Sequence, residues 1–304
     1  MNGSIGICTS VYPIADAFLE DYVDGLSQAV AGHKETTLIL AVENGYNPSR
    51  LISALPASVI AIVQESVSGS TPAGLRGVML AAAVRSKCDY LVFADFDDRL
   101  RPGAIERHLQ ALQGADISYG DLAIIDAESR DLGRTFFDGA CVPEKIHTVT
   151  PVLHRNFLGF SNTAVRRVSI TGAVPKIPDE ISAADWWVYT HLLQAGLTGR
   201  RADGVVSDYR VYANSLLGAN AAGSRHDLIE RCRLALIHYR HLSPLAAPYR
   251  DDVENLAAAL ESTPDWAAKM IVTLQNSPGV WFDDVKRAVD IMLRTTDRTL
   301  ESAP

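Results

Sequence analysis

The sequence predicts an α/β fold in which a mostly parallel β-sheet is covered by helices on both faces and is followed by a helical C-terminal region. Up to about residue 125, short and continuously apolar segments alternate with segments of helical periodicity, as in parallel sheets whose strands are buried on both faces. From about residue 117 to 175 the pattern is weaker and more strand-like, and beyond Ser224 apolar residues recur at helical spacing. The 304 residues allow one α/β domain of about 200–250 residues and an appendage.

The first part of the chain contains four predicted strands separated by predicted helices. The strands are Ile5–Cys8, Thr37–Val42, Val59–Val63 and Tyr90–Ala94. The helices, which carry apolar residues at helical spacing or are rich in alanine, are Phe18–Val30, Leu75–Val84 and Pro102–Gln113. Because ligands bind outside the carboxyl ends of parallel strands, the segments that follow three of these strands are expected to lie together. These segments are Thr9–Tyr12, Glu43–Asn44 and Asp95–Asp98.

Two further elements precede the helical region. Ser182 opens a predicted helix that ends at Gly196, and Val205–Val211 is a predicted strand. The predicted C-terminal helices, which are separated by Ser-Pro or Thr-Pro, are Leu228–Leu242, Val253–Leu260, Trp266–Leu274 and Val285–Leu293.

We assign no chemical role to the polar residues of the C-terminal region. The acid pairs Asp251-Asp252 and Asp283-Asp284 are each expected to open a helix as exposed side chains that complement the helix dipole. His238 and His241 lie three residues apart on a predicted helix and are expected to be solvated. The helices could serve self-association into a homo-oligomer or shape an acceptor site, whereas no basic amphipathic face favours a membrane surface.

Charge and cysteine content exclude several classes of function. Lys and Arg number 28 and Asp and Glu 36, so the formal net charge is −8, and no Lys/Arg cluster favours nucleic acid as a partner. The four cysteines are far apart and form no CxxC pair, which argues against a metal knuckle and a disulfide framework. No segment has the length of a membrane span and the N-terminus lacks a secretory signal, so a cytoplasmic location is predicted. An anionic ligand would need local help from a metal ion, an arginine or a helix N-terminus.

Three carboxylates follow the predicted strand Tyr90–Ala94. Asp95, Asp97 and Asp98 concentrate negative charge at one strand end, which is costly without a positive counterpart. A divalent cation offsets such charge, and oxygen ligands suit Mg²⁺ or Mn²⁺. The alternative is that Asp98 caps the helix that begins near Pro102, while the other carboxylates are solvated. The sequence has no P-loop and no G-x-G-x-x-G after the first strand, which disfavours P-loop hydrolysis and dinucleotide binding.

In their order and spacing, these segments resemble the family 2 glycosyltransferases of the GT-A fold. The resemblance covers about residues 3–215 and rests on Ser10-Val11-Tyr12, Glu43-Asn44-Gly45, a small-residue helix with Arg76, Asp95-Phe96-Asp97-Asp98 and Ala184-Asp185-Trp186. It implies a GT-A-type, Rossmann-like mixed sheet. It also implies inverting transfer of a sugar from a nucleotide-diphosphate sugar, with a UDP-sugar as the favoured donor, to the hydroxyl of a saccharide or other acceptor. Mn²⁺ or Mg²⁺ is the cofactor that the resemblance implies.

The resemblance further implies roles for individual residues. The residues that would bind the nucleotide sugar are Ser10, Tyr12, Glu43, Arg76 and Asp95. Asp97 would hold the metal, Asp185 would be the catalytic base, and Trp186 and Trp187 are candidates for the acceptor side. The implied domains are a transferase domain over residues 1–222 and a helical region over residues 223–304. The first divides into a nucleotide-binding half of about 1–98 and an acceptor half of about 99–222.

The chemistry of sugar transfer requires two distinct anionic centres. The leaving diphosphate gains negative charge, which a metal ion and Arg76 can stabilise. The acceptor hydroxyl must lose a proton to a carboxylate on the opposite side of the sugar. Asp97 and Asp185 fit these two tasks.

The sequence departs from the family pattern at three positions. Glu43 stands where the family usually has Asp, Ala184 replaces the first acid of a common pair, and Tyr212 stands where many members have a metal-assisting His. His226 lies farther along the chain and is expected to be a surface residue. These departures keep a non-catalytic nucleotide-sugar-binding module as an alternative. A sugar nucleotidyltransferase is less favoured, because Thr9–Ala15 contains neither glycine nor a basic residue.

Three segments have a second, structural interpretation. Ser182 and Asp185 match a capping box, in which the acid bonds back to the start of the helix. Trp186 and Trp187 are more typical of a protein core than of a ligand platform. Leu217–Gly223 is either a lid over the donor or a plain linker to the helical region.

Overall fold

The computed structural model of the protein describes residues 3–33, 35–66, 71–212, 222–242, 244–275 and 279–301. The chain divides into two compact units. The α/β unit comprises residues 1–135, 143–149 and 158–214, and the helical unit comprises residues 136–142, 150–157 and 215–304. Most of Leu217–Gly223, the segment considered as a lid or a linker, lies outside the described residues. Among the helices that are described, none combines the length and apolar character needed to cross a membrane.

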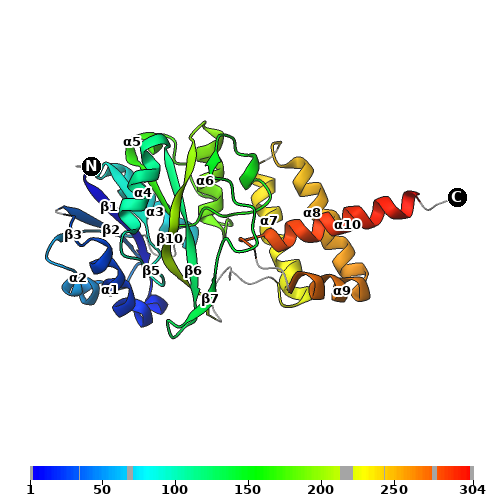
Figure 1. Ribbon diagram of the computed structural model, residues 1–304, viewed down its shortest axis with the longest axis horizontal. Helices are drawn as coiled ribbons and strands as arrows, with labels where there is room; N and C mark the ends of the chain where they lie inside the picture. The colour runs from blue at the N-terminus through cyan, green and yellow to red at the C-terminus, as the bar shows by residue number, and fades with distance from the viewer. Residues whose placement is uncertain are drawn as a thin grey trace. The chain divides into compact units, whose positions relative to one another are not determined.

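A mixed, mostly parallel sheet forms the centre of the α/β unit (Figure 1). The strand order is β3-β2-β1-β4-β9-β6-β10-β5, with β7 beside β6 and β8 beside β10. The first four strands of this order are parallel to one another, as are β6 and β10, whereas β9 is antiparallel to both β4 and β6. The strands are β1 Ile5–Val11, β2 Thr36–Val42, β3 Val59–Glu65, β4 Tyr90–Phe93, β5 Arg99–Leu100, β6 Ile117–Ile125, β7 Asp131–Thr135, β8 Lys145–Ile146, β9 Thr163–Arg166 and β10 Gly199–Arg210.

Helices flank this sheet, so the predicted α/β fold class is confirmed (Figure 1). The helices of the α/β unit are α1 Leu19–Ala29, α2 Ser49–Ala54, α3 Pro72–Arg85, α4 Ala104–Ala111, α5 Arg167–Ile170 and α6 Ala184–Gln194. Every residue of β1 and of β6 is buried, as expected for strands that are covered on both faces of the sheet. The strand β10 begins at Gly199, six residues before the predicted start at Val205, because its first half also pairs with β6.

The order of the strands reverses at β1. Strands β2 and β3 extend from one side of β1, whereas β4 lies on its other side. The register pairs Val11 with Val42 and Cys8 with Phe93, and the N–H of Ala94 donates to the carbonyl of Cys8 at 3.0 Å. The segments that follow β1, β2 and β4 therefore meet at one edge of the sheet. Ligands of open α/β sheets bind at such a point of reversal.

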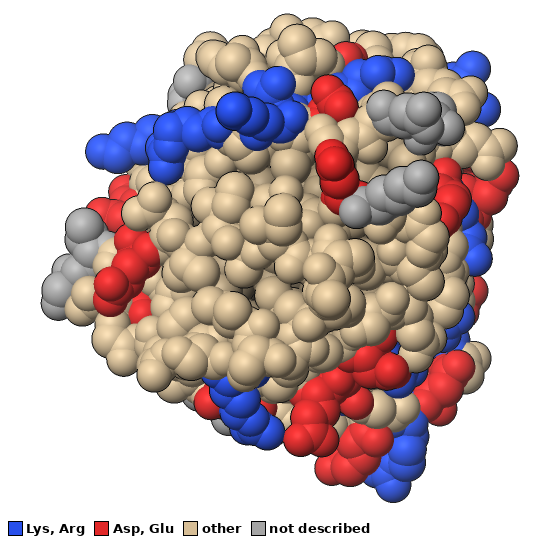
Figure 2. Space-filling view, turned by 90° about the vertical axis from the view of Figure 1, so that its left-hand side faces the viewer, with Lys and Arg blue, Asp and Glu red and all other residues tan. Residues whose placement is uncertain are grey.

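Strand β3 lies at the edge of the sheet and is mostly exposed. Ile60, Ile62 and Val63 are 67%, 45% and 42% exposed. Figure 2 views the molecule from the side on which β3 lies and shows a broad surface without charged side chains. The apolar run Val59–Val63 predicted a strand buried on both faces. The strand exists and continues to Glu65, but its edge position exposes it.

The helical unit is built from four helices and two short segments from the middle of the chain. The helices are α7 Arg225–Leu242, α8 Ala247–Ser262, α9 Pro264–Gln275 and α10 Asp283–Glu301. The ring of Phe136 lies 4.2 Å from that of Trp281, centroid to centroid, and the N–H of Asn156 donates to the carbonyl of Trp281 at 2.9 Å. Segments 136–142 and 150–157 are therefore part of the same core as the helices.

Two acids of the helical unit are buried, contrary to the prediction that they are exposed. Asp283 and Asp284 are 4% and 6% exposed. Asp283 pairs with Arg155 at 3.5 Å and with Arg287 at 2.7 Å, and Asp284 pairs with Arg231 at 2.9 Å. Their burial is possible because each carboxylate has a guanidinium partner.

Two other predictions for this unit are wrong. Helix α8 begins at Ala247, so Asp251 and Asp252 lie in its second turn and do not open it. His238 is 2% exposed because it lies on the buried side of α7, whereas His241 is exposed as expected. His226 is exposed, in agreement with its interpretation as a surface residue.

The close approach of α1 to β5 gives a test of the packing. A Cβ atom at Gly25 of α1 would lie 2.5 Å from Cγ of Arg99 and 2.9 Å from the backbone oxygen of Leu100, whereas a Cβ atom at Gly77 of α3 would meet nothing within 4 Å. We expect Gly25→Ala to lower the free energy of unfolding by about 1–3 kcal/mol through overpacking. We expect Gly77→Ala to raise it by about 0.5–1 kcal/mol, since alanine favours the helix. Urea denaturation measures both changes, and equal effects would contradict this packing.

Candidate functional site

Side chains from three separate segments meet beyond the carboxyl ends of β1 and β4. Tyr12 follows β1, and Asp95 and Asp97 follow β4. Arg76, on α3, lies within electrostatic range of all three and also of Asp185 on α6. The structure therefore brings together five of the residues singled out in the sequence.

Arg76 is the positive partner of Asp95. Its Nη2 atom lies 2.5 Å from Oδ1 of Asp95, and the two side chains are 18% and 20% exposed. The guanidinium lies 5.5 Å from the centroid of the Phe160 ring, and the hydroxyl of Ser161 donates to Oδ2 of Asp95 at 3.1 Å. Burial alone would lower the pKa of Arg76, but the neighbouring carboxylate of Asp95 raises it. Asp95 is thus held on one oxygen by a charge and on the other by a hydroxyl.

Asp97 is held by a tyrosine, and in the described part of the chain no guanidinium forms an ion pair with its carboxylate. The hydroxyl of Tyr212 donates to Oδ2 of Asp97 at 2.9 Å, and Tyr12 is hydrogen-bonded to Tyr212. The Tyr212 ring packs on Phe18 with the centroids 5.3 Å apart. Burial, and then the charge of Asp95, raises the pKa of Asp97. The negative form of this carboxylate is therefore under electrostatic strain that a cation would relieve.

Asp98 is buried at the same strand end. It is 4% exposed, and its Oδ1 atom accepts a hydrogen bond from the backbone N–H of Arg210 at 2.8 Å. Burial raises its pKa well above the usual range, and the charges of Asp97 and Asp95 raise it further. The alternative that Asp98 caps the following helix is wrong, since α4 begins at Ala104 with Gly103 as its N-cap.

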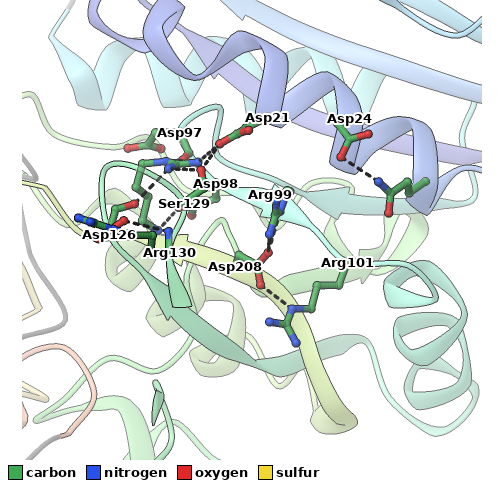
Figure 3. Close-up of polar contacts among 12 residues, drawn as sticks. Asp21, Asp24, Asp97, Asp98, Arg99, Arg101, Asp126, Ser129, Arg130 and Asp208 are labelled. Atoms are coloured by element: carbon green, nitrogen blue, oxygen red, sulfur yellow. Dashed lines mark hydrogen bonds and ion pairs between the residues drawn. The ribbon is translucent and has the colours of Figure 1, made fainter. Parts of the chain in front are cut away.

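Arg210, the last residue of β10, holds the loop that carries Asp97 and Asp98. Its side chain is fully buried, and it lies over the ring of Phe18 at 4.6 Å from the centroid. The guanidinium donates hydrogen bonds to three segments of the chain. Its acceptors are the backbone oxygens of Asp97 (2.8 Å), Asp126 (3.1 Å) and Ala127 (3.1 Å), the hydroxyl of Ser129 (2.8 Å) and the carboxylate of Asp21 (2.7 Å). Figure 3 shows Asp21, Asp97, Asp98 and Ser129 gathered at this point. The loop after β4 is therefore tied to α1 and to the turn after β6.

A second buried ion pair fixes the chain where it leaves this loop. Asp208 of β10 is 2% exposed and pairs with Arg99 at 2.7 Å and with Arg101 at 2.5 Å (Figure 3). Arg99 belongs to β5, which follows the loop directly. The loop between β4 and β5, residues 94–98, is called the acidic loop below. It is thus attached to β10 both through Asp97 and Asp98 and through Arg99, which follows it.

Asp185 lies in the first turn of α6. Its Oδ1 atom accepts a hydrogen bond from the backbone N–H of Trp186 at 2.7 Å. The N-cap of α6 is Ala183, which makes no side-chain capping bond, so the predicted capping box from Ser182 is wrong. The N-terminus of a helix nevertheless stabilises a negative side chain in this position.

Ser10 and Glu43 lie at the sheet edge in different ways. Ser10 is 1% exposed and its hydroxyl donates to the sulfur of Met79 at 3.6 Å, so its side chain lies between β1 and α3 and is not brought into the site. Glu43 is half-buried directly after β2, where its backbone N–H donates to the carbonyl of Val11 at 2.9 Å. Glu43 therefore stands beside the end of β1.

The two tryptophans of α6 are buried. Trp186 and Trp187 are 0% and 5% exposed, and Nε1 of Trp187 donates to the carbonyl of Lys176 at 3.1 Å. Their environment is that of core residues. Contact with an acceptor, proposed for them from the sequence, would require α6 or its neighbours to move.

The strand-end carboxylates fit a hard divalent cation with an incomplete protein shell. Within the described residues, no three His, Cys, Asp or Glu side chains are arranged to hold a metal ion. In the part of the chain that the structure describes, Oδ2 of Asp98 is buried without a hydrogen-bond partner. The pKa of Asp97 is raised although Arg76 lies in range, so the acids here outweigh the nearby positive charge. Mg²⁺ commonly takes one or two protein carboxylates and completes its coordination with water and phosphate oxygens.

Reasoning from the sequence missed the residues that support the site. Ser161 and Arg210 contact the acidic loop, and Asp21 contacts Arg210, yet none was assigned a role. The one signal for Arg210 is an arginine that follows the apolar pair Val205-Val206 near the end of a predicted strand, where a buried charge requires a partner.

Comparison with known proteins establishes the fold. No protein-family model and no curated protein matches the sequence. The crystal structure of S. aureus TarS 1–349 in complex with UDP-GlcNAc matches with a TM-score of 0.57 at 12% sequence identity, over 82% of this chain and 70% of that chain. The mannosyltransferase PcManGT from Pyrobaculum calidifontis, in complex with GDP-Man and Mn²⁺, matches with a TM-score of 0.55 at 12% identity, over 100% of this chain and 82% of that chain. The likeness at such low identity is one of fold.

The buried position of Arg210 predicts that lysine cannot replace it. Lysine keeps the charge but loses the planar fork that reaches several oxygens, so we expect Arg210→Lys to lower the free energy of unfolding by about 2–4 kcal/mol. Arg130→Lys is the matched control, because Arg130 is exposed and pairs with Asp126 at the surface, and it is expected to leave stability unchanged. Urea denaturation measures stability, and hydrogen exchange of residues 95–98 reports the loop. Equal behaviour of the two variants would refute the role of Arg210.

The raised pKa of Asp98 predicts a pH-dependent effect of removing its charge. The unfolded chain has a pKa of about 3.9 here, so between that value and the higher folded pKa the folded protein binds more protons and loses stability as the pH rises. Asp98→Asn keeps an oxygen acceptor for Arg210 and removes the charge. We expect it to melt at a higher temperature than the parent at pH 7 in a chelating buffer, with a smaller difference as the pH falls toward 4. Thermal unfolding across this range is the measurement, and a lower melting temperature at pH 7 is the contrary result.

Proposed function

We propose that the chain is a glycosyltransferase of the family 2 type that moves a sugar from a nucleotide-diphosphate sugar to an acceptor hydroxyl with inversion. The observation that carries the proposal is the meeting of Arg76 with Tyr12, Asp95 and Asp97 at the reversal point of the sheet, with Asp185 in electrostatic range. The likeness of the fold to TarS in complex with UDP-GlcNAc and to PcManGT in complex with GDP-Man and Mn²⁺ supports this class of donor.

The donor site of this proposal lies at the ends of β1, β2 and β4. Tyr12 and Glu43 contact the nucleobase and ribose, Asp95 faces the ribose, and Arg76 lies near the uracil or the diphosphate. A UDP-sugar is the favoured donor. Ser10 contributes through its position in β1, since its side chain is buried. The nucleotide-binding half comprises about residues 1–98 and the acceptor half about 99–222. The helical region 223–304 serves self-association or the acceptor, and the protein acts in the cytoplasm.

Asp97 is the proposed ligand of Mn²⁺ or Mg²⁺. Arg76 forms its ion pair with Asp95, so Asp97 and Asp98 leave negative charge at the place where an anionic donor must bind. A divalent cation bound there supplies charge neutralisation for the leaving diphosphate. Arg210 contributes by holding the backbone of Asp97 and Asp98 in one position.

Asp185 is the proposed general base. The acceptor oxygen forms a bond to the anomeric carbon while the bond from that carbon to the diphosphate oxygen breaks. The electron pair of the broken bond leaves with the nucleoside diphosphate, and the hydroxyl proton moves to the carboxylate of Asp185. The hydrogen bond from the Trp186 N–H and the start of α6 orient this carboxylate and favour its negative charge.

A non-catalytic nucleotide-sugar-binding module is the second candidate. It is favoured by Tyr212, whose hydroxyl occupies Oδ2 of Asp97 at 2.9 Å, and by Ala184 in place of an acid. In such a module, the donor would bind and would be neither transferred nor hydrolysed.

Binding and turnover of the donor test the proposal. The panel contains UDP, GDP and their sugars, with and without Mn²⁺, and binding is read from the shift in melting temperature. We expect one nucleoside diphosphate to stabilise the protein in a Mn²⁺-dependent manner that Asp97→Asn abolishes. We expect Asp185→Asn to keep this shift and to lower the rate of sugar transfer by about 10²–10⁴-fold. Where no acceptor is known, hydrolysis of the donor is measured in place of transfer.

Asp203→Asn is the control, because Asp203 is an exposed acid on β10. No shift with any nucleotide would refute the proposed donor site. Full activity of Asp185→Asn would refute its role as base. Binding without hydrolysis or transfer in the parent protein would identify the non-catalytic module.

A further inference from the structure

The helical unit contains a cavity of about 230 Å³ that the proposed function does not use. Its walls come from α7, α8 and α10, which Figure 1 labels within this unit, and from His154 on segment 150–157. Most of the lining side chains are aliphatic or aromatic. Sites for drug-sized ligands measure about 300–1,000 Å³, so this cavity suits a single ring or a short chain.

The cavity has an apolar floor and a polar rim. Tyr239, Val253 and Val285 are 2%, 3% and 2% exposed and form the floor. Asp252 is half-exposed and Leu293 is 43% exposed, which places both at the rim. A ligand that matches this polarity has an apolar body that enters first and a polar group that stays near the surface.

Asp252 gives the rim an uncompensated negative charge. The other charged groups are matched, since Lys286 pairs with Asp290 at 2.5 Å and the adjacent Asp251 pairs with Arg250 at 2.7 Å. Across the described ranges of the chain, no basic side chain pairs with Asp252. Burial, and then the charges of Asp251 and Asp290, raises its pKa. A cation next to Asp252 would relieve this repulsion.

The rings around the cavity are compatible with a cation. His154 lies 5.5 Å from Tyr249, and Tyr249 lies 6.4 Å from Tyr239, between ring centroids. Burial, and then the charges of Lys286 and Arg155, lowers the pKa of His154 to about 4, so this ring is neutral at pH 7. Its Nδ1 atom is buried without a hydrogen-bond partner in the described structure. A neutral imidazole can accept a hydrogen bond from an N–H group, and tyrosine faces attract cations.

We propose that this cavity binds a small organic ammonium ion whose short apolar body lies on the floor and whose ammonium group lies beside Asp252 at the rim. A lysine side chain of another protein fits less well, because its ammonium group would enter first and meet the apolar floor. An anion is disfavoured by the unmatched charge of Asp252. The site belongs to the helical unit and does not rest on the proposed function.

Three probes of similar shape and different charge test this proposal. They are benzylamine, benzyl alcohol and benzoate, which are titrated into the 304-residue protein at pH 7 and followed by ligand-observed NMR. We expect benzylamine to bind at least about tenfold more tightly than the other two, which corresponds to about 1.4 kcal/mol. Acetyl-lysine-amide, which carries its ammonium group at the tip, is expected to bind at least about tenfold more weakly than benzylamine.

Two variants of neighbouring acids provide the matched comparison. Asp252→Asn keeps the size of the side chain and removes its charge. We expect it to weaken the binding of benzylamine about tenfold and to leave the affinity for benzyl alcohol unchanged. Asp251→Asn removes a charge one residue away that is already paired with Arg250, and it should change neither affinity. Leu293→Lys, at an exposed rim position, adds a positive charge and should also weaken benzylamine selectively.

Each contrary result overturns the proposal. Such results are absence of benzylamine binding, equal binding of the three probes, tighter binding of acetyl-lysine-amide, or unchanged benzylamine affinity in Asp252→Asn. Melting temperatures are recorded for all variants. If Asp252→Asn does not fold, the affinity of Leu293→Lys for benzylamine tests the proposal instead, since Leu293 lies at the exposed rim and outside the core. Unchanged benzylamine affinity in that variant also overturns the proposal.

Discussion

The arrangement of the candidate site depends on the buried guanidinium of Arg210. A charge at 1% exposure is tolerated because five oxygen atoms surround it, and those oxygens belong to the acidic loop, the turn after β6 and helix α1. The same residue holds Asp98 through its backbone N–H, and Tyr212 holds Asp97 two residues later. The end of β10 therefore defines where the carboxylates after β4 lie.

Five buried or half-buried acids of the described structure differ in the partners that they face. Asp208, Asp283 and Asp284 each face guanidinium groups, and their role is to join segments of the chain. Within the described residues no guanidinium or ammonium group forms an ion pair with Asp97 or Asp252, and burial and neighbouring carboxylates raise the pKa of both. Burying these two carboxylates in their charged form costs free energy of folding. Both lie at positions where we infer that a cation arrives with, or as, the ligand.

Much of the fold could be predicted because its signals are local. Apolar runs predicted β1, β2, β3 and β4. The general rule for ligand sites of parallel sheets predicted that Tyr12 lies near Asp95 and Asp97, as it does. The failures depend on distant partners. The buried Asp284 pairs with Arg231, which lies 53 residues away in the sequence, and the exposure of β3 depends on its place in the sheet. Likewise, the predicted capping box failed because α6 begins beyond Ser182, and the role of Arg210 became visible only with its folded partners.

Arg210 contacts residues that lie far away in the sequence, and this affects when the loop is fixed during synthesis of the chain. Arg210 lies 112 residues from Asp98 and 189 residues from Asp21, so the acidic loop is fixed by contacts of very long range. Such contacts form late, because the entropy of closing the loop must be overcome first. A ribosome that adds about 5–20 residues per second completes β1 to β4 many seconds before β10 exists. For that interval the nascent chain carries the loop after β4 without the contacts that Arg210 and Tyr212 make to Asp97, and the proposed donor site is complete only once β10 has formed.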